Sequence, residues 1–199
     1  MSAEPQLRTP LGRDMNAVRL LALGLVLLGC RASPATSDDG GDAEVERAIE
    51  LTIEQLYAAF DFGPDGEADW DGMRALFAPG AVFYAPIGPS GRAQGVDAAR
   101  FLADFQSWSR TSPDVRDGLH ERIDATRVEH LGNIAHAWVT FTGFVPGSGE
   151  ERTQGVDSIQ LVRVGGTWKL ASFTSHFASE EAPLPARFQG GKAGGGSGR

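Results

Sequence analysis

Among the residue types that can carry out chemistry, the pair that stands out in this chain is Asp157 and His176. Both lie in runs whose alternating apolar and polar residues predict β-strands. A carboxylate beside an imidazole can move a proton, because one group accepts what the other releases. Tyr84 could add a hydroxyl donor, although a phenol with a pKa of about 10 is a poor base at neutral pH. The alternative is structural: the two side chains would satisfy each other's hydrogen bonds in a wet cavity.

A predicted hairpin brings this pair together. If Gly165-Gly166 is a two-residue turn, counting back along both strands places Asp157 opposite Thr174. His176 follows two residues later and points the same way, so the two side chains would be diagonal neighbours about 7 Å apart between backbones. Asp157 and His176, with Tyr84, are the candidate catalytic residues.

A second turn at Gly132-Asn133, with Val145 opposite Arg152, extends the assignment to two more strands. One face then carries a mixed set: Ala125, Arg127, Trp138, Thr140, Asp157, Ile159, Ser172, Thr174 and His176. The other face carries Ala135, Ala137, Val139, Phe141, Val156, Val162, Ala171, Phe173 and Phe177. The mixed face is typical of ligand pockets, and the predicted lining is Phe105, Trp108, Arg127, Trp138, Thr140, Ile159 and Thr174. A slip of one residue would exchange the faces.

The four histidines do not predict a metal site. None is paired at the spacing of metal ligands, and the first hairpin would place His130 and His136 on opposite faces. Fingerprints for a serine nucleophile, for nucleotide phosphates and for dinucleotides are absent from the sequence as well. We therefore expect neither a metal nor a cofactor.

The elements that would position these residues follow from hydrophobic periodicity. Residues 44–61 predict an amphipathic helix whose apolar stripe is Val45, Ile49, Ile53, Leu56 and Phe60. Residues 69–77 and 96–110 predict two shorter helices, with a β-rich run at 81–87 between them. Four long strands joined by turns follow, over residues 118–131, 134–145, 152–164 and 167–178. This order predicts an α+β fold with its helices gathered on one face of an antiparallel sheet.

The element order resembles the NTF2-like superfamily, which includes SnoaL-like cyclases and ketosteroid isomerases. The resemblance lies in the segments LYAAF, DWDGMRALFAPGAVFYAPIG, GVDAARFLADF and GVDSIQLVRVGGTWKLASF, and it covers nearly the whole domain. It implies a cone, in which three N-terminal helices pack on a strongly curved antiparallel β-sheet with a pocket at the open end. It also implies that the chain could form a homodimer through the sheet.

The isomerases of that superfamily offer a test of catalysis. They use a carboxylate base, a tyrosine donor and a protonated aspartic acid to stabilise a dienolate. The base position is matched here by Ala85, which cannot take a proton. The tyrosine position is matched by Leu56, with Tyr57 one residue further along and rotated by about 100°. Only Asp157 matches, so ketosteroid isomerase chemistry is not expected, and whether another reaction is catalysed stays open.

The N-terminal region has the features of a signal peptide that ends in the chain's one cysteine. Its apolar run, residues 20–29, is half the length of about 20 residues that a membrane-spanning helix needs, and basic residues precede it. The last four residues, Leu27-Leu28-Gly29-Cys30, resemble the bacterial lipobox, in which the chain is cut before the cysteine and the thiol carries lipid. We therefore expect residues 1–29 to be removed and Cys30 to be lipidated.

Composition divides the rest of the chain. Residues 30–43 are small, polar and acidic and predict a flexible tether, residues 44–188 form one domain, and residues 189–199 are a glycine-rich disordered tail. A formal net charge of −8 argues against nucleic acid as a partner. It also argues against electrostatic adsorption to anionic lipid, so the membrane contact would be covalent.

These features predict a lipoprotein of the cell envelope whose NTF2-like domain binds a small, partly apolar ligand. Arg31 after the cysteine is not the aspartate associated with inner-membrane retention in some bacteria, so the outer membrane is favoured if the host has two membranes. Two alternatives stay open. A cofactor-free cyclase, dehydratase or isomerase would use Asp157 with His176. An envelope interaction module would instead bind a partner or a second copy through its sheet.

Overall fold

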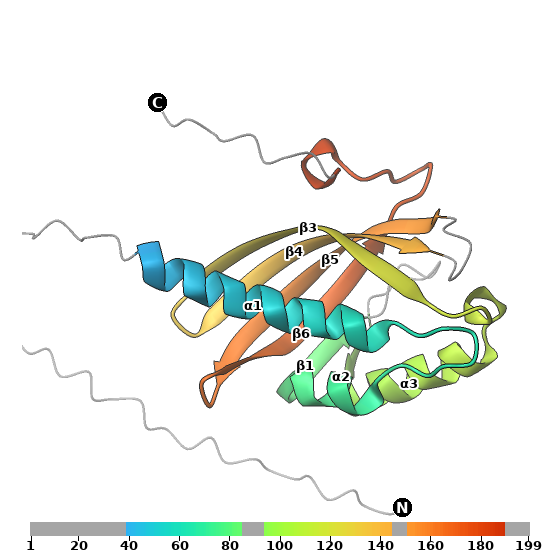
Figure 1. Ribbon diagram of the computed structural model, residues 1–199, viewed down its shortest axis with the longest axis horizontal. Helices are drawn as coiled ribbons and strands as arrows, with labels where there is room; N and C mark the ends of the chain where they lie inside the picture. Colours follow the sequence, from blue (N-terminus) through green and yellow to red (C-terminus); the bar gives the residue numbers. More distant parts are fainter. Residues whose placement is uncertain (1–38, 85–93, 145–150, 190–199) are drawn as a thin grey trace, which may run out of the picture. The chain divides into compact units, whose positions relative to one another are not determined.

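The computed structural model describes residues 39–84, 94–144 and 151–189. In these ranges the chain forms three α-helices and one six-stranded sheet (Figure 1). The elements follow one another as α1 (Asp39–Phe60), α2 (Trp70–Leu76), β1 (Phe77–Tyr84), β2 (Gly95–Asp97), α3 (Ala98–Thr111), β3 (His120–Leu131), β4 (Ile134–Phe144), β5 (Glu151–Val164) and β6 (Thr167–Phe177). The predicted α+β fold, with three helices ahead of the main run of strands, is confirmed.

Several predicted features lie outside the described residues: the signal peptide, Cys30, most of the tether, Ala85 and the tail beyond residue 189. Within the predicted tether, α1 already begins at Asp39, ahead of the expected start at residue 44. The first turn of the helix therefore includes Asp42, whose negative charge favours a helix N-terminus. None of the described helices has the length and apolar character needed to cross a membrane.

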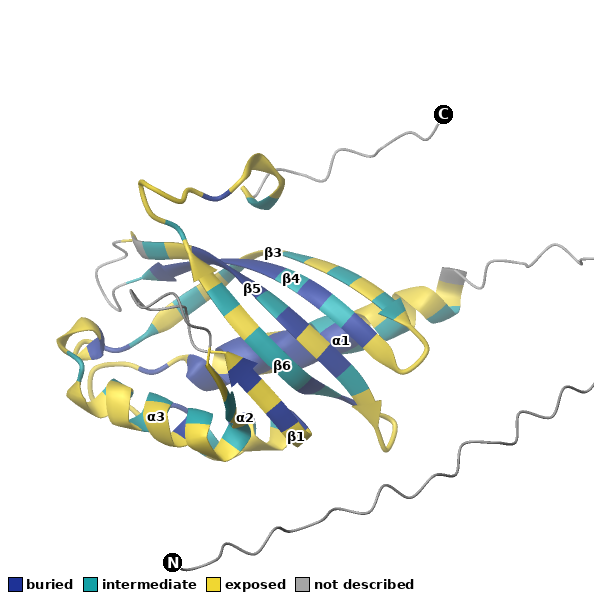
Figure 2. Cartoon of the chain, turned by 180° about the vertical axis from the view of Figure 1, so that it is seen from behind, coloured by how far each residue is buried: buried dark blue, intermediate teal, exposed yellow. Residues whose placement is uncertain are grey.

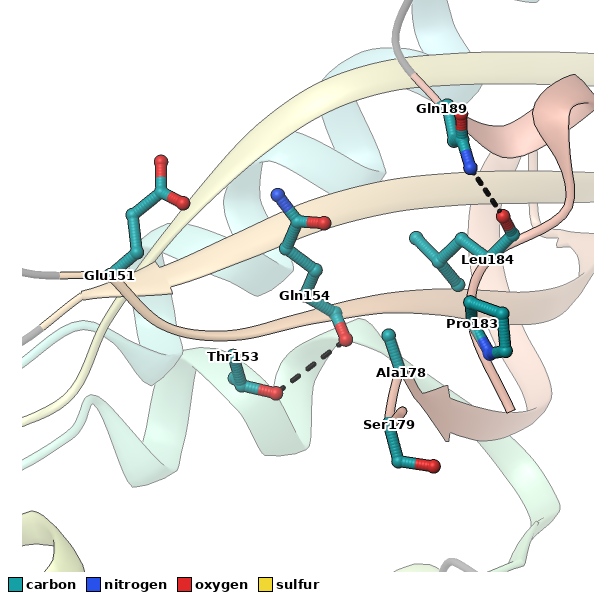
Figure 3. A pocket seen from close by; sticks show the side chains of 8 residues that line it. All are labelled: Glu151, Thr153, Gln154, Ala178, Ser179, Pro183, Leu184 and Gln189. Carbon is teal, nitrogen blue, oxygen red and sulfur yellow. Dashed lines mark hydrogen bonds between the residues drawn. The ribbon is translucent and has the colours of Figure 1, made fainter. Parts of the chain in front are cut away.

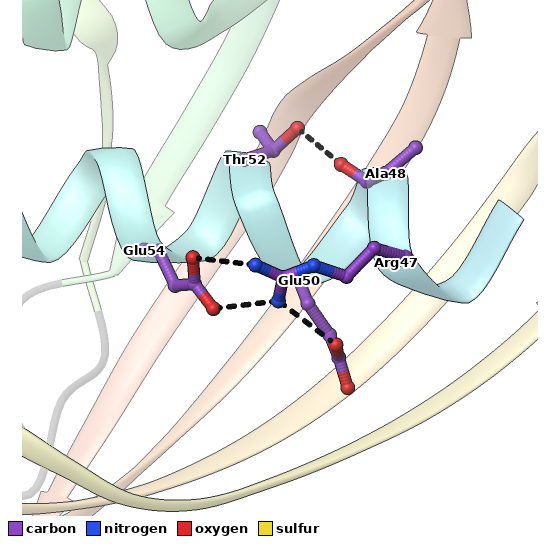
Figure 4. Close-up of polar contacts among 5 residues, drawn as sticks. All are labelled: Arg47, Ala48, Glu50, Thr52 and Glu54. Carbon is purple, nitrogen blue, oxygen red and sulfur yellow. Dashed lines mark hydrogen bonds and ion pairs between the residues drawn. The ribbon is translucent and has the colours of Figure 1, made fainter. Parts of the chain in front are cut away.

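Helix α1 packs one side against the sheet and exposes the other. The buried stripe consists of Ile49, Ile53, Leu56, Tyr57 and Phe60. Tyr57 follows Ile53 by four residues, which places the two on the same face of the helix. On the exposed side, the Arg47 guanidinium donates hydrogen bonds to Glu50 and Glu54 (Figure 4). Such exposed pairs add little stability, so the helix is held mainly by its stripe.

The sheet has the strand order β2-β1-β6-β5-β4-β3 and curves around α1 (Figures 1 and 2). Strands β3 to β6 form an antiparallel meander, with the predicted turns at Gly132-Asn133 and Gly165-Gly166. All three turn glycines have positive φ, which explains why glycine is favoured there. The meander runs inward from one edge, so β6 comes to lie beside β1. That one pair is parallel, which differs from the wholly antiparallel sheet expected.

The register between β3 and β4 agrees with the prediction near the turn, but the register between β5 and β6 does not. Those two strands pair as expected next to their turn. A β-bulge then adds Ala171 as an unpaired residue of β6. Asp157 therefore lies opposite Ser175, whereas the prediction placed it opposite Thr174. A bulge of this kind cannot be seen in a count of residues from the turn.

The register between β4 and β5 is also shifted by one residue from the prediction. Phe144 pairs with Glu151, and the register changes next to this pair. Asp157 consequently lies opposite Val139, whereas the prediction placed it opposite Thr140. Because side chains alternate along a strand, each shift moves whole sets of residues to the other face.

The two faces of the sheet therefore differ from those predicted. The face covered by α1, here called the helix face, carries Val128, Ala137, Val139, Phe141, Asp157, Ile159 and Phe173. The opposite face, here called the outer face, carries Arg127, Trp138, Thr140, Thr174 and His176. The C-terminal segment, residues 178–189, lies over part of the outer face, where the Phe188 ring is 5.2 Å from the Trp138 ring. Figure 2 shows the resulting alternation of buried and exposed positions along the strands.

Candidate functional site

A buried hydrogen bond joins α1 to the helix face of the sheet. The Tyr57 hydroxyl donates to Oδ2 of Asp157 at 2.7 Å. Tyr57 belongs to the buried stripe of α1 and Asp157 lies near the middle of β5, so regular elements fix both side chains. Each residue is only 4% exposed. Aspartate is rarely buried this deeply unless its oxygens have partners.

The second oxygen of that carboxyl, Oδ1 of Asp157, is buried without a hydrogen-bond partner. Burial raises the pKa of Asp157 to about 6, although the hydroxyls of Ser175 and Tyr57 act in the opposite direction. Ser175 is thus near enough to favour the charged form, but it does not make a well-formed hydrogen bond to Oδ1. Burial and the charge of Asp157 raise the pKa of Tyr57 well above its usual value, so Tyr57 remains a donor.

Glu121, at the start of β3, is a second acid on the helix face. It lies two residues before Ile123, which packs against the core, and therefore points to the same side. Its partner on β4 is Gly143, where the methyl group of Thr153 lies 2.9 Å from the position that a Cβ atom would take. Burial, and then the charge of Asp157, raises the pKa of Glu121 to about 8. At neutral pH this carboxyl mostly keeps its proton.

A bulge in β3 adds a third carboxyl. Asp124 is the unpaired residue of that bulge. Its Oδ2 accepts a hydrogen bond from the Thr142 hydroxyl at 2.5 Å, and its Oδ1 accepts two from the Arg122 guanidinium. Its partners Thr142 and Arg122 both lie on the outer face, so the Asp124 carboxyl turns away from the helix face, although its charge adds to the raised pKa of Tyr57. We call Tyr57, Glu121 and Asp157 the acid cluster.

At neutral pH the acid cluster offers three hydrogen-bonding groups. The free oxygen of Asp157 accepts, the protonated Glu121 donates, and the Tyr57 oxygen can accept, because its one proton is already donated to Asp157. The Phe141 ring, 6.0 Å from the Tyr57 ring, supplies an apolar wall. This combination can bind a small molecule that is partly polar. A carboxyl with a pKa of about 6 can also exchange a proton near neutral pH.

The structure does not bring the predicted catalytic residues together. Asp157 lies on the helix face, whereas His176 and Tyr84 lie on the outer face with Thr174. The Nε2 atom of His176 is 3.3 Å from the carbonyl oxygen of Ala182 in the C-terminal segment. The predicted proton-transfer pair of Asp157 and His176 is therefore wrong. Its physical cause is the bulge in β6, because an unbroken register would have kept the two residues on one face.

The predicted pocket lining is divided in the same way. Ile159 is fully buried on the helix face. The outer face holds Arg127, Trp138, Thr140 and Thr174. Phe105 and Trp108 lie on α3, where their rings stack at 5.4 Å. Phe105 also packs edge-on against Phe60 of α1 and Trp70 of α2, so it belongs to the contact between helices, whereas Trp108 is 37% exposed.

A separate hollow of about 410 Å³ lies between β5 and the C-terminal segment (Figure 3). Its lining consists of Glu151, Thr153, Gln154, Ala178, Ser179, Pro183, Leu184 and Gln189. The Gln189 side chain donates to the Leu184 carbonyl oxygen at 2.7 Å, within the wall of the hollow itself. None of its side chains has a buried polar atom left without a partner. The acid cluster is therefore the stronger candidate.

Sequence patterns alone do not single out Tyr57, Glu121 or Asp124. The signal for Tyr57 is its spacing from Ile53, which places it on the apolar stripe of α1. Glu121 could be found from its alternation with Ile123. Asp124 has no such signal, because its position depends on a bulge. Over the described parts of the chain, no group of three or more His, Cys, Asp and Glu side chains could hold a metal ion.

Solved structures show what this fold is similar to. A protein of unknown function with a cystatin-like fold from Nostoc punctiforme is 14% identical, with a TM-score of 0.56, over 69% of this chain and 94% of that chain. A protein of unknown function from Mycobacterium tuberculosis is 13% identical, with a TM-score of 0.55, over 76% and 83%. An NTF2-like protein of unknown function from Pseudomonas putida is 14% identical, with a TM-score of 0.51, over 74% and 94%. At these identities the likeness concerns the fold alone.

The comparison with protein families covers most of the domain. No curated protein matches the chain. The family model of the SnoaL-like domain matches residues 53–170, a stretch that begins within α1, ends within β6 and contains both Tyr57 and Asp157. Since this match spans more than half of the sequence and the fold is that of NTF2-like proteins, the chain belongs to the SnoaL-like domain family.

Proposed function

We propose that the chain binds a small, partly apolar molecule beside the acid cluster, between α1 and the helix face of the sheet. The observation that carries this proposal is Oδ1 of Asp157, a buried acceptor without a partner. Leaving such an atom unpaired costs on the order of 1 to 3 kcal/mol. A ligand group that donates a hydrogen bond to Oδ1 would offset that cost, so the site favours a ligand with an O–H or N–H group.

The neighbours of Asp157 indicate how such a ligand would lie. Val139 is opposite Asp157 in the sheet, and Phe141 is the next residue of β4 on the helix face. Both are apolar and buried. The polar end of the ligand would therefore meet Asp157 and Tyr57, and its apolar part would lie against Phe141. Binding pockets commonly combine apolar walls with a few polar groups in this way.

Native mass spectrometry of the gently purified chain tests the proposal. We expect a bound small molecule on the wild-type chain and much less of it on Asp157→Asn and Tyr57→Phe. Tyr84→Phe is the matched control, because Tyr84 lies on the outer face and is 42% exposed. A ligand that stays bound to both cluster variants, or a wild-type chain that takes up no small molecule from cell extract, would refute the proposal.

We also propose that lipid on Cys30 holds the domain at a membrane of the cell envelope, the outer one in a host with two. The support is the lipobox-like sequence and the short stretch of eight residues, 31–38, that separates Cys30 from the start of α1. With Cys30→Ser we expect the protein to lose the mass of the lipid and to leave the membrane fraction. A wild-type chain without lipid would contradict this.

A further inference from the structure

The charges around the acid cluster are unbalanced. Burial and the charge of Asp157 both raise the pKa of Glu121. The groups that shift the pKa values of Asp157, Glu121 and Tyr57 include hydroxyls and carboxyls but no Lys, Arg or His side chain. The guanidinium of Arg122 is engaged by Oδ1 of Asp124 through two hydrogen bonds. Within the described residues, the two acids of the helix face, Asp157 and Glu121, thus have no cation beside them.

We propose that the ligand of this site carries a protonated amine, which donates a hydrogen bond to Oδ1 of Asp157. This inference rests on the proposed function and adds the chemical class of the ligand. The second observation behind it is independent of the charges: Oδ1 is an unpartnered atom of a carboxyl that is 4% exposed. An ammonium group supplies both things that are missing here, a donor and a positive charge.

Other ligand groups would supply less. A neutral hydroxyl could satisfy Oδ1 of Asp157, but it would leave the negative charge that Asp157 carries above its pKa of about 6 without a counter-charge. A carboxylate or phosphate would add a further negative charge to a partly buried site, where Coulomb interactions are stronger than in water. The expected order of affinity is therefore amine, then alcohol, then anion.

The aromatic side chains of the site support the same choice. The rings of Tyr57 and Phe141 are tilted by 60° to each other, with their centres 6.0 Å apart. A cation near such rings is attracted by their negatively charged faces. The apolar part of the ligand can lie against the same rings, so an aliphatic or aromatic amine suits the site better than a small hydrated metal ion.

Three probes of similar size test the inference: 2-phenylethylamine, 2-phenylethanol and phenylacetate. Their dissociation constants would be measured by NMR titration of the wild-type chain near pH 7, where the amine is protonated. We expect the amine to bind at least about tenfold more tightly than the alcohol, and phenylacetate to bind most weakly. Asp157→Asn should reduce the preference for the amine while leaving the affinity for the alcohol nearly unchanged. Glu121→Gln should change the preference little, because Glu121 is mostly neutral near pH 7.

The relative affinities of the three probes separate the inference from the proposed function. If the alcohol binds as tightly as the amine, the inference is wrong but the proposed ligand site stands. If none of the three probes binds, both are refuted. If the amine is preferred equally by wild type and Asp157→Asn, the preference comes from the overall negative charge and the inference falls. Glu46→Gln on the exposed side of α1 is the control for that last effect, and it should leave the preference as it is in the wild type.

Discussion

At the scale of single residues, the two acids of the helix face cost the fold stability. Burial raises the pKa of Asp157 from 3.8 to about 6 and that of Glu121 from 4.5 to about 8. At a pH between the ordinary and the raised pKa of each acid, the folded chain holds a proton that the unfolded chain has released. The free energy of unfolding therefore falls as the pH rises through each window.

We expect the free energy of unfolding to be greater near pH 5 than near pH 8, by on the order of 1 to 3 kcal/mol. Urea denaturation at a series of pH values measures this difference. Asp157→Asn should flatten the dependence of the unfolding free energy on pH below about pH 6, because an amide does not titrate. Glu121→Gln should flatten the same dependence up to about pH 8. A wild-type chain that is as stable at pH 8 as at pH 5 would show that these acids are not buried as described.

We expect the hydrogen bond between Tyr57 and Asp157 to stabilise the fold. Tyr57→Phe keeps the ring in the stripe of α1 but leaves both oxygens of Asp157 without this donor. We expect a loss of about 1 to 2 kcal/mol in the free energy of unfolding and a further rise in the pKa of Asp157. Chemical denaturation and NMR titration of the carboxyl measure the two effects. Tyr84→Phe should change neither, and an equal loss in both variants would count against the bond.

At the scale of elements, periodicity predicts the helices and turns but not the registers. The stripe of α1 and the glycine turns are local features, so the sequence is enough to place them. The bulges at Asp124 and Ala171 depend on how the sheet curves around the helix, and no sequence pattern beside either residue predicts them. One extra residue in a strand exchanges its faces. This is why Asp157 could be predicted as a site residue while its partner could not.

The curvature of the sheet also makes a glycine necessary at position 155. A Cβ atom there would collide with the Phe141 ring and lie 2.9 Å from the carbonyl oxygen of His176. We expect Gly155→Ala to lower the free energy of unfolding by about 1 to 3 kcal/mol, because neither neighbour can move freely. Gly40→Ala in α1 is the control, since nothing lies within 4 Å of its Cβ position. Denaturation midpoints that agree for the two variants would contradict this packing.

At the scale of the whole domain, the C-terminal segment covers part of the outer face of the sheet. The resemblance to NTF2-like proteins predicted that the sheet would form the contact in a homodimer. The Ala178 amide donates to the Gln154 carbonyl oxygen at 2.8 Å, which continues the sheet past β6. Leu184 is buried, and Phe188 lies against Trp138 of the outer face. The segment therefore covers part of the outer face of the sheet within one chain.

We expect deletion of residues 182–199 to lower the melting temperature and to increase self-association, because Trp138 would lose the cover of Phe188 and the buried Leu184 would be removed. Light scattering after size-exclusion chromatography measures the mass, and a chain that lacks only residues 190–199 is the control. If the shortened chain keeps the mass and melting temperature of the control, the segment does not protect this face. If it has a smaller mass instead, the segment builds an interface between copies. The acid cluster lies on the other face of the same sheet, so in either case binding of 2-phenylethylamine should be the same in the two chains, and a change would show that the faces are coupled.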